Sequence, residues 1–267
     1  PPAQRRQAYV LHRLASNLGL AVGPALGGIV AQHAFSALFW IDGLTTLLGA
    51  AILVAWVPAT PGSPSEGKSL SGWRDRRLLF LLLGLLPVTM VFTQIHASLP
   101  LWVSRDLAFG PRIFGLIFTL NTLLILLLEV ALNTRLASWR MGRQFALGAC
   151  LIAAGFGCTG AARSLPLLAL SVVLWSFGEM ILLPISSEAV AELAPPDRRG
   201  EYMGLYSLSW TFAMTLGPWL GLLAYGGFGP RLFWPVCGIF ALLSAVALWR
   251  FGIRHPEGAR PPKLHIT

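Results

Sequence analysis

The sequence predicts an all-α membrane protein with eight transmembrane helices. Of its 267 residues, 55% are hydrophobic and only 12% are charged, whereas a soluble domain carries about 25% charged residues. Its apolar runs are long and continuous, as in LLFLLLGLLPV at 78–88, and a spanning helix needs roughly 20 such residues. A transmembrane barrel would alternate apolar and polar residues instead. Most basic residues fall between these runs, so the net charge of +9 indicates membrane topology and not nucleic-acid binding.

The polar gaps divide the chain into four parts. A linker is predicted at 58–77, because this segment is rich in Pro, Ser, Gly and charge. Two helices precede it within 1–57, a six-helix bundle follows at 78–253, and a cytoplasmic tail is expected at 254–267. We predict the eight helices at 8–31, 36–57, 78–103, 112–134, 144–162, 166–190, 202–225 and 231–250.

The basic residues are distributed unevenly between the two sides that these helices define. One side carries 16 of the 20 Lys and Arg residues, and the other carries Arg105, Arg112, Arg163 and Arg231. The richer side is cytoplasmic by the positive-inside rule. Both ends of the chain and the linker are therefore predicted to be cytoplasmic. A missed or extra helix would scramble this split, so the split also supports the helix count.

The first helix carries a small residue at every fourth position, which lets another helix approach closely. Pro24 lies within this stripe and introduces a bend. Helix packing explains the stripe by itself, but a bent seam could also hinge and seal against ion leak. The stripe consists of Ala15, Gly19, Gly23, Gly27 and Ala31.

Ionisable groups within the membrane are costly, so each is a functional candidate. Asp42 lies in the outer part of the second helix, where a bond to a neighbouring helix is its favoured role. In the third helix, Thr93 and His96 are predicted to face the same way as Thr89, with Gln94 about 100° away. His96 is interpreted mainly as a hydrogen-bonded packing residue and alternatively as a proton relay.

The fourth helix carries a carboxyl group within a run of leucines. Thr122, Glu129 and Asn133 are predicted to form one stripe, with Asn121 beside it. Glu129 lies nearer the cytoplasmic end than the middle of the helix. It is therefore either a pathway residue or a partly solvated residue at the membrane surface.

Glu179 is the strongest candidate, because it lies near the middle of the sixth helix. It is predicted to share a face with Val172, Trp175 and Ser186. Desolvation disfavours the charged form of a carboxyl group, so such a group can exchange a proton beside an aromatic ring and a hydroxyl. The alternative is a structural hydrogen bond to another helix.

The first two helices repeat as the last two. PPAQRRQAY at 1–9 is similar to PPDRRGEY at 195–202, and further matches follow at an offset of 194 residues once a one-residue gap is allowed. They pair Gly23-Pro24 with Gly217-Pro218, Gly27 with Gly221, and Phe39-Trp40 with Phe233-Trp234. Parallel repeats of this kind are typical of transporters.

At these residues the sequence resembles the major facilitator superfamily of secondary transporters. The run Gly19-Leu-Ala-Val-Gly23-Pro24-Ala-Leu-Gly27-Gly28 is similar to the antiporter signature of the family's fifth helix. Leu136-Ala-Ser-Trp-Arg140-Met-Gly142-Arg143 is similar to a degenerate copy of its loop motif between helices eight and nine, with the expected Asp replaced. The long linker lies where the family has its central cytoplasmic loop.

The resemblance implies helices five to twelve of a twelve-helix, two-bundle transporter, with four more helices expected upstream of Pro1. It implies a proton-coupled exporter of small lipophilic or amphipathic compounds that is multi-pass in the inner membrane and monomeric when full length. The expected partners are a small-molecule substrate, protons and the lipid bilayer. The alternatives are a facilitator or symporter of a small metabolite, or a non-transporting membrane fragment.

No arrangement of residues in the sequence indicates an enzyme, a metal site or a cofactor. The three cysteines, Cys150, Cys158 and Cys237, lie inside apolar runs and lack metal-ligand spacing. We expect them to be small core residues.

The topology predicts that Ser65 faces the cytoplasm. A cysteine introduced there should resist a membrane-impermeant thiol reagent added to intact cells and react after the cells are opened. Modification from outside intact cells would contradict the assignment.

Overall fold

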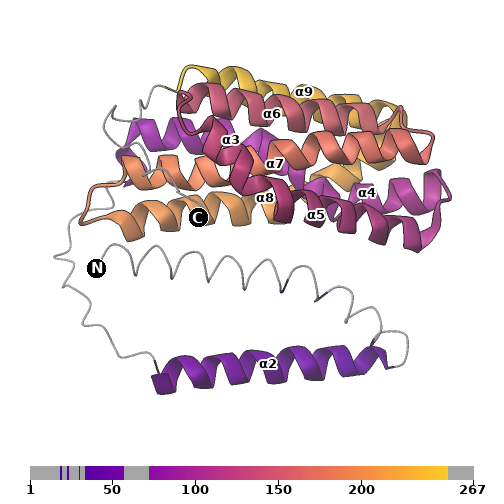
Figure 1. Cartoon of the computed structure of the whole chain (residues 1–267), viewed down its shortest axis with the longest axis horizontal. Coiled ribbons are helices and arrows are strands. Elements are labelled where there is room, and N and C mark those ends of the chain that lie inside the picture. The colour runs from indigo at the N-terminus through magenta and orange to yellow at the C-terminus, as the bar shows by residue number, and fades with distance from the viewer. Residues whose placement is uncertain (1–18, 20–22, 24–29, 31–33, 57–71, 252–267) are drawn as a thin grey trace, which may run out of the picture. The chain divides into compact units, whose positions relative to one another are not determined.

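The computed structural model describes residues 19, 23, 30, 34–56 and 72–251 (Figure 1). The chain divides into two units, Pro1–Lys68 and Ser69–Thr267. In the first, the described residues form helix α2 (Phe35–Trp56), as predicted for 36–57. The predicted helix at 8–31 and most of its glycine motif, including Pro24, Gly27 and Gly28, lie outside the described residues.

The second unit is a bundle of long helices joined by short turns (Figure 1). Each helix predicted between 78 and 250 overlaps an observed one, with ends that differ by a few residues except at 78–103. The helices are α3 (Arg76–Phe92), α4 (Ser98–Leu101), α5 (Gly110–Leu136), α6 (Met141–Thr159), α7 (Leu165–Leu193), α8 (Arg199–Phe228) and α9 (Pro230–Trp249). The described residues of both units contain no β-strand.

Six segments among the described residues are long and apolar enough to cross a membrane. Helix α8 is not one of them, because glycine, hydroxyl and aromatic residues dilute its apolar residues. The predicted total of eight spanning helices therefore stays a prediction. The six segments are Ser36–Trp56, Arg76–Asp106, Arg112–Leu136, Met141–Thr159, Leu165–Leu193 and Pro230–Trp249.

Local sequence signals set the helix ends. Asp75 caps α3, and its carboxylate accepts hydrogen bonds from the backbone amides of Arg77 at 2.8 Å and Leu78 at 3.4 Å. Helices α5, α7 and α9 each begin with a proline in the first turn, where no backbone donor is lost. Gly229 ends α8 with a φ of 76°, a conformation that favours glycine.

The predicted continuous helix at 78–103 is wrong in its second half. Helix α3 ends at Phe92, a 3-10 turn occupies Thr93–Ile95, and a π-helical turn at Trp102–Asp106 follows α4. Pro100 lacks a backbone donor and disfavours a continuous helix here. Side chains bond to the backbone instead, since Thr93 Oγ1 donates to Met90 O at 2.7 Å.

Helix α6 packs closely against α7 and α9, and glycines allow this approach. A Cβ on Gly155 would lie 2.7 Å from the backbone nitrogen of Trp175, and one on Gly178 would lie 2.7 Å from the carbonyl oxygen of Gly148. A row of aromatic side chains fills the space between the helices. Its members are Phe92, Trp102, Phe156, Trp175 and Trp234.

The expected burial of the cysteines holds for only one of them. Cys237 is buried, whereas Cys150 and Cys158 are exposed. These two residues lie with Ala154 on the exposed face of α6 at helical spacing. An apolar run in a membrane protein supplies both core and lipid-facing residues, so hydrophobicity alone cannot separate the two.

The glycines of α8 that repeat the first-helix motif contact two polar side chains. A Cβ on Gly217 would clash with Thr93 Oγ1, and one on Gly221 would clash with the amide group of Gln94. Gln94 Nε2 donates to Gly217 O at 2.7 Å. The α8 copy of the repeat therefore forms a close-packed seam with α3 and its extension, while the seam predicted for Gly23 and Gly27 stays a prediction.

This contact predicts that Gly221→Ala destabilises the bundle. The added methyl group displaces Gln94, and overpacking of this kind costs about 1–3 kcal/mol. The matched control is Gly204→Ala on the same helix, where a Cβ meets no atom within 4 Å. Thermal unfolding in detergent should show a lower midpoint for the Gly221 variant only. Equal midpoints for the two variants would contradict the seam.

Candidate functional site

Glu179 lies on α7 within the bundle and is bonded to α5. Its Oε2 accepts a hydrogen bond from Asn121 Nδ2 at 2.9 Å. The same amide group lies 2.9 Å from Ser176 Oγ and donates to it. Asn121 and Ser176 are both buried, so the three side chains form a small polar cluster inside a membrane-spanning bundle.

A small cavity opens beside this cluster. Its volume is about 10 Å³, which is room for about one water molecule. Helices α3, α6, α7 and α8 supply its walls, which are mainly apolar and aromatic. The polar and aromatic side chains that line it are Thr89, Phe92, Glu179, Ser186, Tyr206 and Trp210.

Two other predicted pathway residues, Trp175 and Thr122, are not among the side chains that line this cavity. Trp175 does not line this cavity: it packs in the core, with its ring centroid 5.9 Å from that of Phe156. Thr122 is only half-buried, and Asn121 is the α5 residue that reaches Glu179. The rotational position of α5 decides this, and no sequence pattern fixes it.

Glu129 lies two turns farther along α5, and its side chain is 8% exposed. The alternative of a partly solvated surface residue is therefore wrong. The neighbouring Asn133 bridges α5 and α7, because its Nδ2 donates to Glu129 O at 2.8 Å and to Met180 O at 3.0 Å. Asn133 thus ties the turn of α5 that carries Glu129 to α7.

The polar residues after α3 do not share the predicted face. Thr93 and Gln94 are buried against α8, whereas His96 is exposed, with its ring 6.3 Å from that of Phe118. The helix on which the spacing rests ends at Phe92, which explains the difference. Gln94 Oε1 also accepts a bond from Ser98 Oγ at 2.8 Å, so Gln94 stabilises the irregular segment.

Asp42 and the antiporter motif lie in the first unit. Asp42 is exposed on α2, and Thr45 donates to the carbonyl oxygens of Ile41 and Asp42. The helix expected to pack beside it, 8–31, lies outside the described residues except for Gly19, Gly23 and Val30. Its predicted interhelical bond stays a prediction.

The loop motif brings two helix ends together. A Cβ on Gly142, in the first turn of α6, would clash with Trp249 O and lie 2.8 Å from Phe251 O. Only glycine fits this approach of α6 to the end of α9. Arg140 and Arg143 flank it and are both exposed.

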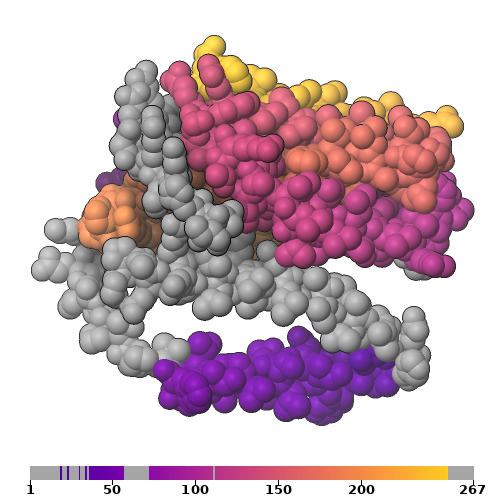
Figure 2. Space-filling view, in the orientation of Figure 1, coloured from indigo at the N-terminus to yellow at the C-terminus, as the bar shows by residue number. Residues whose placement is uncertain are grey.

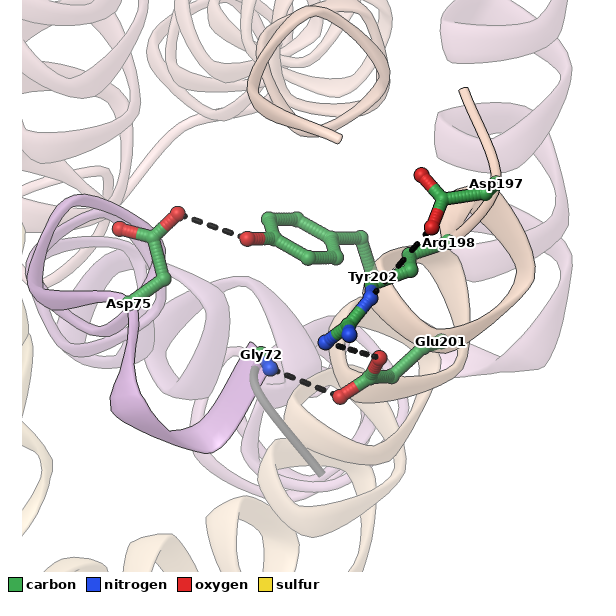
Figure 3. A network of polar contacts seen from close by, with 6 residues as sticks. All are labelled: Gly72, Asp75, Asp197, Arg198, Glu201 and Tyr202. Atoms are coloured by element: carbon green, nitrogen blue, oxygen red, sulfur yellow. Dashed lines mark hydrogen bonds and ion pairs between the residues drawn. The ribbon is translucent and has the colours of Figure 1, made fainter. Parts of the chain in front are cut away.

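A polar network joins the start of α3 to the start of α8 (Figure 3). Tyr202 Oη donates to Asp75 Oδ2 at 2.8 Å, and Gly72 N donates to Glu201 Oε1 at 2.7 Å. Arg198 forms ion pairs with both neighbouring carboxylates: its Nη1 lies 4.0 Å from Glu201 Oε2, and its Nε lies 3.7 Å from Asp197 Oδ2. Sequence reasoning missed this network, although Asp75 before an apolar run is an N-cap signal.

The opposite end of α8 is held in a similar way. Tyr225 Oη donates to Asp106 Oδ2 at 2.6 Å. Asp75 and Asp106 bracket the spanning segment Arg76–Asp106. Two tyrosine–aspartate pairs therefore fix both ends of α8 to both ends of that segment, around the Gly217 and Gly221 seam.

The sequence profile of the Major Facilitator Superfamily matches residues 1–110 and 81–265 of the chain. The chain belongs to the major facilitator superfamily. This membership and the apolar helices make it a multi-pass membrane protein.

Several transporters of the superfamily are similar to the chain. The uncharacterized MFS-type transporter YttB of Bacillus subtilis is 23% identical over 86% of this chain and 60% of its own length. The multidrug resistance protein MdtH of Aeromonas hydrophila is 26% identical over 97% of this chain and 67% of its own. The chain spans about 60% of the length of the Bacillus subtilis relatives that it matches.

Solved structures share the fold. The human organic anion transporter MFSD10 aligns with a TM-score of 0.53 and 22% identity, over 64% of this chain and 40% of that chain. A POT family transporter solved with 5-aminolevulinic acid aligns with a TM-score of 0.56 and 16% identity, over 93% and 54%. The superfamily fold that the sequence motifs predicted is therefore confirmed, whereas the correspondence to helices five to twelve stays a prediction.

The Asp75 cap predicts a pH-dependent contribution to stability. Partial burial by itself raises the pKa of Asp75, but the bonds from Tyr202, Arg77 and Leu78 and the charge of Arg77 outweigh it, so the pKa lies below its usual range. A lowered folded-state pKa gives stability that is present above the ordinary pKa of about 4 and is lost as the pH falls through the folded value.

Asp75→Ala should therefore lower the free energy of unfolding by about 1–2 kcal/mol near neutral pH. The difference in the free energy of unfolding between this variant and the unmodified protein should become smaller below about pH 4. Asp197→Ala, at a largely exposed carboxylate of the same network, is the control and should have little effect. Unfolding midpoints in detergent between pH 3 and 7 measure both. A difference in unfolding midpoint between the Asp75 variant and the unmodified protein that stays constant with pH would contradict the role of the cap.

Proposed function

We propose that the chain supplies helices five to twelve of a secondary active transporter that works by alternating access. Its activity is proton-coupled efflux of a small lipophilic or amphipathic compound. The observation that carries the proposal is Glu179, a carboxyl group in the bundle interior whose partner among the described side chains is the neutral Asn121. Intramembrane acidic residues are typical of substrate and proton pathways.

The lining of the cavity beside Glu179 favours a lipophilic substrate. Phe92 and Trp210 line it with apolar and aromatic surface, and their ring centroids lie 6.3 Å apart. Ligand sites combine such walls with a few convergent polar groups, here Thr89, Ser186 and Tyr206 beside Glu179. A cavity that admits about one water is too small for an organic substrate, so substrate entry requires the walls to separate, as alternating access provides.

Protonation supplies the coupling. A neutral Glu179 suits the mainly apolar lining of this cavity, because charge is disfavoured there. Opening to water on one side, or the approach of a polar substrate, favours release of the proton. If the two openings alternate, one proton and one substrate compete for the same group and move in opposite directions. The bond from Asn121 holds the carboxyl group at the cavity wall.

The relatives support transport of organic compounds without fixing one class. MdtH is named as a multidrug resistance protein, MFSD10 as an organic anion transporter, and a POT family transporter was solved with a conjugated peptide. A facilitator or symporter of a metabolite is the second candidate. It would use the same cavity, but a facilitator would not need the carboxyl group to titrate.

The test is Glu179→Gln in the full-length protein, reconstituted in vesicles with an imposed pH gradient. Glutamine keeps the size of the side chain and its hydrogen bonding, but it fixes the neutral form. Gradient-driven accumulation should fall to background, while substrate binding or counterflow exchange is retained in part. Substrate is identified beforehand by screening lipophilic compounds for gradient-dependent uptake.

The matched control is Glu188→Gln, an exposed carboxylate on the same helix, which should leave accumulation unchanged. Glu129→Gln should reduce accumulation less than Glu179→Gln. Unchanged accumulation by the Glu179 variant would refute its role, and loss in the Glu129 variant alone would assign the coupling to Glu129. If transport by the unmodified protein did not depend on the imposed pH gradient, this result would favour a facilitator.

A further inference from the structure

A second, larger hollow lies on the outer surface of the bundle, away from Glu179. It runs between α6 and α9, which lie side by side (Figures 1 and 2), with Phe80 of α3 at its edge. Its volume is about 860 Å³, within the range of sites that hold organic ligands. We call it the α6–α9 groove, and the transport proposal does not use it.

The groove is apolar along its length and basic at one end. Leu147, Leu242 and Val246 line the apolar part, where Val246 is 74% exposed. Arg143, in the first turn of α6, and Arg250, which follows the last turn of α9, stand at its mouth. Both arginines are exposed, and no carboxylate in the described part of the chain forms an ion pair with either.

The backbone contact at Gly142 places these two arginines at one mouth. A Cβ on Gly142 would clash with the carbonyl oxygen of Trp249. Arg143 and Arg250, the next residue after each of them, therefore belong to adjoining helix ends. The α6 N-terminus adds a positive partial charge at the same place. A side chain at position 142 would push the two helix ends apart.

Two tryptophans indicate where the basic end of the groove lies relative to the membrane surface. Trp139 and Trp249 line the groove beside the arginines and are about half exposed. Tryptophan favours the level of lipid headgroups. The arginines therefore stand at headgroup level, on the side of the membrane that carries most of the basic residues, and the apolar part extends toward the acyl chains.

We propose that the α6–α9 groove binds one anionic phospholipid. Its phosphate lies between Arg143 and Arg250, and one acyl chain follows the apolar surface of α6 and α9. Charge complementarity selects the anionic headgroup, because basic pockets between spanning helices on the cytoplasmic side bind such lipids. The apolar surface along the groove favours a lipid over a free anion, because a free anion has no acyl chain to contact it. The degenerate loop motif thus gains a role in lipid recognition through Arg143 and Gly142.

The test is native mass spectrometry of the purified protein in detergent with equal amounts of phosphatidylglycerol and phosphatidylethanolamine. Phosphatidylglycerol should remain bound in preference. Arg143→Gln with Arg250→Gln should lower the bound fraction about tenfold, because each arginine near an anionic headgroup contributes several-fold in affinity. The control is Arg135→Gln with Arg199→Gln, which removes two exposed charges from the same end of the bundle, and it should bind normally.

A further variant tests the apolar part without changing charge. Val246→Trp fills the groove at an exposed position and should also lower the bound fraction, while millimolar inorganic phosphate should not displace the lipid. Equal binding of the two lipids, or an equal loss in both double variants, would overturn the proposal. Displacement by phosphate would assign the arginines to a free anion, and full binding by the Val246 variant would place the lipid elsewhere.

Discussion

The contact between α8 and the irregular end of α3 is the constraint on which the rest of the bundle depends. The spanning segment Arg76–Asp106 loses its regular helix after Phe92, and backbone polar groups at membrane depth must then find partners inside the protein. Gln94 Nε2 donates two of these bonds, to Met90 O and Gly217 O, and Gln94 Oε1 accepts a further bond from the side chain of Ser98. It can do so only because α8 presents glycine where other residues would collide.

The same contact fixes the position of the candidate site. Tyr202 and Tyr225 hold the two ends of α8 to Asp75 and Asp106, so α8 cannot slide along the Arg76–Asp106 segment without breaking both pairs. Tyr206 and Trp210 belong to the stretch of α8 between these anchors and face the cavity beside Glu179. Rigid placement of α8 is therefore what gives Glu179 its aromatic surroundings.

Glycine allows close approach at several places among the described residues, and three of these contacts bear on the cavity and the groove. Gly155 and Gly178 join α6 to α7, Gly217 and Gly221 join α8 to the end of α3, and Gly142 joins α6 to the end of α9. Within a membrane, helices gain little from hiding apolar surface from one another, so backbone proximity and polar contacts drive their association. The first two contacts join helices that line the cavity, and the third joins the two helices that line the groove.

Composition, apolar run length and the order of charged residues determine much about this protein without a structure. They predict a helical membrane protein, the approximate place of each helix after the linker, the repeated glycine motif and the superfamily. Glu179 was also predicted as a site, because a carboxyl group in the middle of an apolar run is costly and needs a reason. These features depend on local hydrophobicity and on single residues, which a sequence displays directly.

Only the tertiary structure decided which side chains meet. It paired Asn121 with Glu179, buried Glu129, turned His96 away from Thr93 and placed Trp175 in the core. Helical spacing gives the relative angles of residues on one helix, but the rotation of that helix against its neighbours comes from packing. In a chain that is apolar on nearly every face, hydrophobic periodicity carries no signal for that rotation, and close contacts at glycines and a few buried hydrogen bonds set it instead.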